Sequence, residues 1–176
     1  MIRKLRTDEL GRMSVEDFRQ AKKIPVTVVL DDIRSAMNVG SVFRTADAFA
    51  VEKILLCGIT AVPPNREITK TAIGATESVM WEYEADIEQV IHRLKESGYQ
   101  VIAVEQTDRS VPLTDLLPQG GKLAVVFGNE VEGVSNSVLA LSDACVEIPQ
   151  FGTKHSLNVS VCAGIVMWEL AKKYRD

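Results

Sequence analysis

The sequence is poor in the residues that build metal sites and disulfide frameworks. Its 176 residues include three cysteines and two histidines. Cys57, Cys145 and Cys162 are widely spaced, and each lies in apolar sequence, as reduced core cysteines usually do. We therefore expect no disulfide framework, no zinc site and no catalytic metal.

Long apolar runs are also missing. No stretch approaches the roughly 18 to 20 apolar residues of a membrane span, and the N-terminal stretch MIRKLRTDELGRMS lacks the apolar segment of an export signal. We expect a cytoplasmic protein without a membrane anchor. The patterns G-x-x-x-x-G-K-[ST] and G-x-G-x-x-G are absent too, which argues against a phosphate-binding loop of the usual kinds.

The chain has no overall excess of positive charge, because its formal net charge is −4. This argues against a protein that coats nucleic acid indiscriminately. The charge is uneven, however, since residues 1–24 hold seven basic and four acidic side chains. We interpret residues 1–24 as a basic N-terminal arm with a short helix from about Val15 to Lys23. This arm either binds a polyanion or is merely a solvated amphipathic segment.

Residues 25–176 show strand patterns that alternate with helical patterns. Amphipathic or apolar helices are expected at 38–49, 86–98, 134–142 and 157–174. Apolar, β-branched strands are expected at 25–33, 53–58, 79–83, 99–106, 122–128 and 143–149. The alternation predicts one α/β domain with a mostly parallel sheet of five or six strands flanked by helices.

Polar clusters follow three of these strands, where ligands gather in open α/β sheets. The first contains Asn38, Gly40 and Arg44 at the start of a helix, and the second is the loop GNEVEG at 128–133, whose glycines suggest close approach of backbone to a ligand. The third, KHSLNVS at 154–160, precedes an apolar helix and has more polar residues than helix capping requires. Arg44 has an alternative role as a structural partner of a carboxylate such as Asp47.

Two further chemical interpretations are weaker. His155 and Ser156 are adjacent, but no G-x-S-x-G elbow is present, and neighbouring residues seldom form a nucleophile and base pair. Asp31 and Asp32 follow the first strand, where a turn role is more typical than a metal site. Neither pattern therefore predicts a hydrolase or a metalloenzyme.

Together the three clusters resemble the motifs of the SPOUT superfamily of RNA methyltransferases, in its SpoU or TrmH-like branch. The resemblance covers essentially residues 25–174. Ala50 and Gln150 depart from the usual Gly and Met, but neither change removes a polar functional group. The matching segments are NVGSVFRTADAF at 38–49, VFGNEVEGVS at 126–135, and IPQFG followed by SLNVS at 148–152 and 156–160.

This resemblance implies a SPOUT fold with a C-terminal deep trefoil knot, which general folding rules would not predict. It also implies a homodimer that uses S-adenosyl-L-methionine to methylate the ribose 2′-hydroxyl of an RNA. A tRNA is favoured because no second RNA-binding domain is recognisable, and an rRNA is the second candidate. A non-catalytic knotted RNA-binding protein and a base-methylating relative are competing interpretations. The retained polar residues argue against the first, and the Asn-x-Gly-x-x-x-Arg pattern argues against the second.

The resemblance also assigns the site residues. The resemblance implies that Arg44 is the catalytic residue. A guanidinium with a pKa above about 12 is a poor general base. We therefore expect Arg44 to hold a phosphate and to stabilise the alkoxide charge that develops in the reaction. The remaining catalytic candidates are Asn38, Glu130, Ser156 and Asn158. The cofactor-binding candidates are Gly128, Asn129, Gly133, Ile148, Ser156 and Leu157.

Overall fold

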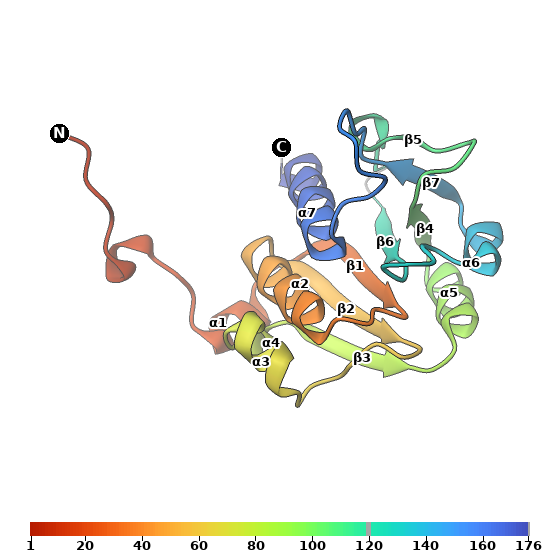
Figure 1. Ribbon diagram of the computed structural model, residues 1–176. Helices are drawn as coiled ribbons and strands as arrows, with labels where there is room; N and C mark the ends of the chain where they lie inside the picture. Colours follow the sequence, from red (N-terminus) through yellow and green to blue (C-terminus); the bar gives the residue numbers. More distant parts are fainter. Residues whose placement is uncertain (119–120, 176) are drawn as a thin grey trace.

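The protein folds as a parallel sheet covered by helices on both faces (Figure 1). The computed structural model describes residues 1–118 and 121–175. The helices in these ranges are η1 (Thr7–Leu10), α1 (Val15–Gln20), α2 (Ala36–Ala48), α3 (Arg66–Ala72), α4 (Ala75–Ser78), α5 (Ile87–Glu96), η2 (Leu113–Asp115), α6 (Asn136–Leu141) and α7 (Val159–Arg175).

The sheet has seven strands in the described part of the chain, in the order β3-β2-β1-β6-β4-β7-β5. All the strand pairings within it are parallel. The predicted count of five or six was wrong because β5 has only two residues, too short to produce an alternating pattern. The strands are β1 (Ile24–Asp31), β2 (Val51–Cys57), β3 (Met80–Glu84), β4 (Tyr99–Val104), β5 (Val111–Pro112), β6 (Lys122–Phe127) and β7 (Ala144–Glu147).

The central strands are buried on both faces, as their continuous apolar sequence predicted. In β1, Val28 and Leu30 pack into a core beneath α2 and α7, whereas Val29 points to the opposite core beneath α5 and α6. Strand β6 alternates in the same way. Because the central strands contribute to both cores, the sheet holds its carboxyl edge in a fixed position for the loops that follow.

The N-terminal arm contacts the domain through α1. Phe18 is buried against the larger core, and the Arg19 guanidinium donates to the carbonyl oxygen of Glu77. Residues before α1 extend away from the domain (Figure 1). The short helix expected in the arm ends at Gln20, and Ala21 after it is extended.

Candidate active site

A cavity of about 550 Å³ lies where the loops after β4, β6 and β7 meet the start of α7. This is the carboxyl edge of the parallel strands, where the sequence predicted a site. Eight of the predicted site residues line it, and Asn38 and Arg44 do not. The lining residues are 104–106, 127–134, 147–148, 150, 155–159 and 162.

Asn129 folds the loop after β6. Its Oδ1 accepts hydrogen bonds from the N–H groups of Val131 (2.8 Å) and Glu132 (3.1 Å). Its Nδ2 donates to the carbonyl oxygen of Asp32 at 2.7 Å. Asn129 therefore lines the cavity, but its side chain acts on the loop and on the turn after β1.

Gly128 and Gly133 allow the same loop to fold back on itself. A Cβ at Gly128 would overlap the carbonyl group of Gly133, and Gly133 has a positive φ of 69°. Both positions therefore favour glycine for the loop's own geometry. At Gly128 the close neighbour is the loop's own backbone, and at Gly133 it is the carboxylate of Glu105.

Glu130 connects this loop to the start of α2. Its carboxylate accepts hydrogen bonds from the N–H groups of Arg34 (2.8 Å) and Ser35 (3.1 Å), and from Asn38 Nδ2 (3.2 Å). Burial raises the pKa of Glu130, but these hydrogen bonds outweigh it, and the net shift is downward. A charged Glu130 is thus favoured, because the three donors compensate its carboxylate.

Asn158 connects α7 to α2. Its Oδ1 accepts from the N–H groups of Ser160 (2.9 Å) and Val161 (3.3 Å), so it caps α7. Its Nδ2 donates to Asn38 Oδ1 at 3.2 Å. Asn38 consequently lies between Glu130 and Asn158, and the three side chains form one continuous hydrogen-bonded chain beside the cavity.

Ser156, Leu157 and Ile148 line the cavity from the segment between β7 and α7. Helix α7 begins at Val159, two residues later than the predicted Leu157, so Ser156 and Leu157 belong to the preceding loop. Ile148 packs against the edge of the core, and Leu157 remains 37% exposed. These two aliphatic side chains give the cavity an apolar wall.

Arg44 lies on the exposed side of α2 and is not among the residues that line the cavity. Within the described ranges it forms no ion pair with Asp47, whose carboxylate instead accepts a hydrogen bond from the Ser78 hydroxyl. The alternative role of Arg44 as a partner of Asp47 is therefore wrong.

Glu105 and Gln106 also line the cavity, although neither was predicted from the sequence. Glu105 Oε2 accepts from the Val134 N–H at 2.9 Å, and Gln106 Nε2 donates to the carbonyl oxygen of His155 at 3.2 Å. Their position directly after a buried strand was the available signal, because β4 ends at the same edge of the sheet as β6 and β7.

Residues 1–118 and 121–175 contain neither a cluster of metal-ligating side chains nor a helix that could span a membrane. No group of three or more His, Cys, Asp or Glu side chains in these ranges is placed to hold a metal ion. No helix there has the length and apolar character to cross a bilayer. Asp32 takes the turn role expected of it, with its Oδ1 accepting from the Ile59 N–H at 2.9 Å.

The model of the SpoU rRNA Methylase family matches residues 25–168. The chain belongs to this family. Among curated proteins it is similar to the 23S rRNA (guanosine-2′-O-)-methyltransferase RlmB of Neisseria meningitidis, with 33% identity over 149 residues. That match covers 85% of this chain and 59% of the relative, so the chain spans about three fifths of that protein's length.

Solved structures agree with this assignment. The AdoMet-bound rRNA methyltransferase from Sinorhizobium meliloti superposes with a TM-score of 0.80 at 27% identity, covering 88% of this chain and 59% of that one. The TrmH/SpoU tRNA modifying enzyme of A. aeolicus superposes with the same TM-score at 24% identity, and the match covers 90% of this chain and 81% of that enzyme. At this identity the likeness supports the fold alone. Because the Sinorhizobium meliloti structure is bound to AdoMet, S-adenosyl-L-methionine is the cofactor consistent with that relative and with the family.

Proposed function

We propose that this protein transfers a methyl group from S-adenosyl-L-methionine to a ribose 2′-hydroxyl of a structured RNA. The observation that carries the proposal is the hydrogen-bonded chain from Glu130 through Asn38 to Asn158. It joins the three sequence motifs, which are far apart in the chain, at one cavity of suitable size for a cofactor. The similarity to RlmB supports the ribose 2′-hydroxyl as the acceptor.

The cofactor would lie in the cavity. Ile148 and Leu157 would flank its adenine, while backbone groups of Gly128, Asn129, Gly133 and Ser156 would contact its polar atoms. S-adenosyl-L-methionine supplies an electrophilic methyl group, so the protein's task is alignment of the acceptor and removal of its proton.

Arg44 would hold the phosphate next to the reacting ribose and stabilise charge that develops on the 2′-oxygen. A phosphate oxygen or water would take up the hydroxyl proton, since the guanidinium stays charged. Asn38 and Glu130 would orient the ribose side of the site, and Ser156 and Asn158 would fix the loop before α7 and contact the substrate.

The position of Arg44 outside the cavity lining supports a homodimer, in which Arg44 serves the cavity of the partner subunit. The dimer is further supported by exposed apolar side chains on α7, where Val161, Ile165 and Trp168 are exposed by 53%, 39% and 55%. These residues recur on one face of the helix. Trp168 also contacts the Phe49 ring at the end of α2, with centroids 5.6 Å apart, so this face adjoins the Arg44 helix.

The trefoil knot predicted from the resemblance belongs to the same proposal. The segment between β7 and α7 contacts Gln106 after β4 and Asn38 on α2 before it enters α7. Passage of this segment through a loop of the chain would hold the cavity walls together.

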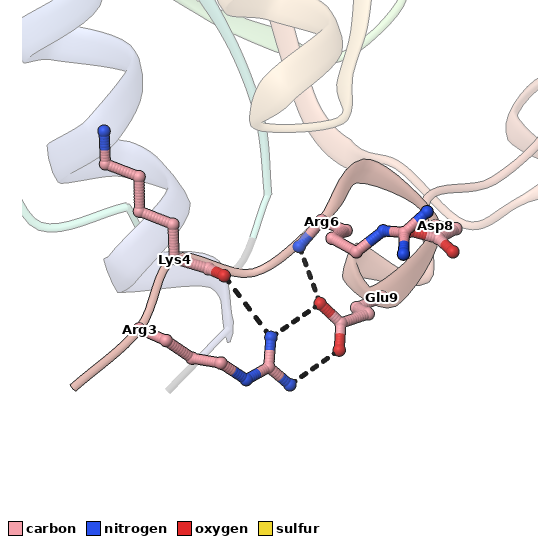
Figure 2. Close-up of polar contacts among 5 residues, drawn as sticks. All are labelled: Arg3, Lys4, Arg6, Asp8 and Glu9. Carbon is pink, nitrogen blue, oxygen red and sulfur yellow. Dashed lines mark hydrogen bonds and ion pairs between the residues drawn. The ribbon is translucent and has the colours of Figure 1, made fainter. Parts of the chain in front are cut away.

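The basic arm would contact the RNA backbone. Figure 2 shows that Arg3 forms a bidentate ion pair with Glu9, with N–O distances of 2.7 and 2.9 Å. Glu9 also accepts from the Arg6 N–H at 2.7 Å, so one carboxylate orders this part of the arm. Lys4 and Arg12 form no ion pair within the described ranges, and their charges are available to phosphates.

The proposed substrate is a cytoplasmic tRNA, which the dimer and its N-terminal arms would recognise. An rRNA is the second candidate, supported by RlmB. Purified protein would be incubated with methyl-labelled cofactor and total RNA from cells that lack it, and alkali-resistant dinucleotides would then be mapped. Label in one tRNA position supports the proposal, whereas label in rRNA or on a base would contradict its substrate or acceptor. No label in any RNA would favour a non-catalytic RNA-binding protein.

A further inference from the structure

The cavity has an acidic wall. Four glutamates line it, and the described lining residues include no lysine or arginine and one histidine, His155. None of the four forms an ion pair within the described part of the chain. The negative charge of the wall is therefore not cancelled by a side-chain cation. The four residues are Glu105, Glu130, Glu132 and Glu147.

Glu105 is the member of this group whose carboxylate joins two walls of the cavity. Its Oε1 accepts from the Gln106 N–H at 2.8 Å, and its Oε2 accepts from the Val134 N–H at 2.9 Å. A Cβ at Gly133 would overlap the same carboxylate, so the loop after β6 packs directly against it. The charge is consequently held in place before any ligand binds.

The field of Glu105 reaches the start of α7. Cys162 lines the cavity there, and burial raises the pKa of its thiol to about 11, with the negative charge of Glu105 as the second cause. A positive charge inside the cavity would be stabilised by the same field that disfavours a thiolate.

We propose that Glu105 makes the cavity selective for the cationic methyl donor over the demethylated product. In the reaction the sulfur–methyl bond breaks, the bond from methyl carbon to ribose oxygen forms, and the hydroxyl proton leaves. The sulfonium becomes a neutral thioether, so the product carries one positive charge less than the donor. Loss of that charge weakens its attraction to Glu105 and promotes release of S-adenosylhomocysteine.

This inference rests on the proposed function, because it takes the cavity as the donor site. A purely structural role for Glu105, in which it only shapes the loop through Val134, predicts a different result. Disruption of the loop weakens every ligand of the cavity to the same extent. Removal of a charge weakens cationic ligands and leaves the neutral-sulfur product unchanged.

The test is isothermal titration calorimetry without RNA, on the wild type and on Glu105→Gln. The ligands are S-adenosylmethionine, sinefungin, whose amine replaces the sulfonium charge, and S-adenosylhomocysteine. The wild type is expected to bind both cationic ligands about five- to tenfold more tightly than the product, and Glu105→Gln is expected to bind all three about equally. Glu96→Gln, an exposed change on α5, should retain the wild-type preference.

Salt dependence keeps the proposal testable even if Glu105→Gln is poorly folded. Raising the ionic strength should reduce the ratio of the wild type's affinity for the donor to its affinity for the product. Screening weakens the attraction of Glu105 to the cationic donor more than its attraction to the product. Equal affinity of the wild type for donor and product, or equal weakening of all three ligands in Glu105→Gln, would overturn the proposal. Ligand selectivity that persists in a protein unable to methylate RNA would instead count against the proposed function alone.

Discussion

Asn158 Nδ2 donates a hydrogen bond of 3.2 Å to Asn38 Oδ1, although the two residues are 120 positions apart in the chain. Asn38 in turn donates to Glu130, so the start of α7, the start of α2 and the loop after β6 are joined by side chains. This relationship explains the polar density before α7, since Asn158 serves both as the cap of α7 and as a link to α2.

The two roles of Asn158 are separable. Asn158→Asp keeps an oxygen for the N–H groups of Ser160 and Val161 but loses the donor to Asn38. We expect stability within about 1 kcal/mol of wild type, because the cap remains, and a loss of methyl transfer of about tenfold or more. Urea unfolding and initial rates measure the two effects. Asn158→Asp with full activity would contradict a role for the link to Asn38.

Arg44 is predicted to act through its planar guanidinium. Arg44→Lys keeps the charge but loses bidentate hydrogen bonding, so we expect kcat to fall by about tenfold or more. Donor affinity should change little, because Arg44 is proposed to contact the RNA phosphate and the 2′-oxygen and not the donor. Arg93→Lys on α5 is the matched control. Near-full activity of Arg44→Lys would rule out bidentate recognition.

The exposed face of α7 is predicted to form the dimer. Trp168→Glu places a charge on this face and should weaken association by about 2 kcal/mol or more, as expected for a central aromatic residue of an interface. Light scattering after size exclusion measures the mass, and methyl transfer should fall with the dimer fraction. Met80→Glu, at a position 66% exposed on β3, is the control and should remain dimeric. A Trp168→Glu protein that stays dimeric would place the interface elsewhere.

The arm is predicted to contribute charge to RNA binding. Deletion of residues 1–13 leaves α1 and its buried Phe18 in place, whereas deletion of residues 1–23 would also remove core packing. The shorter deletion should weaken RNA binding and reduce its logarithmic salt slope by roughly 0.7 to 0.9 for each phosphate that the arm no longer neutralises. Filter binding at several salt concentrations measures the slope, and an unchanged slope would make the arm structural.

The raised pKa of Asp31 predicts how the stability of the protein varies with pH. Burial, and secondly the charge of Asp32, raise the pKa of Asp31 from 3.8 to about 6. The folded protein therefore holds more protons than the unfolded protein between these values, and this residue lowers stability as pH rises from about 4 to 6. Asp31→Asn should stabilise the protein by about 1 to 3 kcal/mol at a pH of about 7.5 and change little at a pH of about 3.5. A variant that is destabilised at the higher pH would contradict this prediction.

The central strands and longer helices could be predicted from sequence because their signals are local. Val26 to Leu30 form a run that is apolar except for Thr27, and Ile87 to Leu94 have a helical apolar period. Strand β5 was missed because two residues carry no period, and its pairing with β7 is set by tertiary packing. The end of α1 at Gln20 could not be placed for a similar reason, since nothing in residues 21–23 marks the stop before Pro25.

The cavity lining was predicted in part because some of its residues also carry a local sequence signal. Gly128, Glu130, Ser156 and Asn158, which line the cavity, were selected from the sequence because they stand in motifs with fixed spacing, and their roles stay predictions. Glu105 was not found, because its position after β4 is a signal shared by many residues, and its role depends on Val134 in a loop far along the chain. The direction of Arg44, away from the cavity lining, is likewise a property of the folded helix.

The central claim is that the donor binds in one cavity formed by three loops. Hydrogen–deuterium exchange with and without S-adenosylhomocysteine tests this claim, because the method reports on all the loops at once. We predict slower exchange at residues 128–134 and 148–158 together, with additional protection near 105–106 and none in residues 1–13. Protection confined to a single loop, or located away from the carboxyl edge of β4, β6 and β7, would show that the donor binds elsewhere.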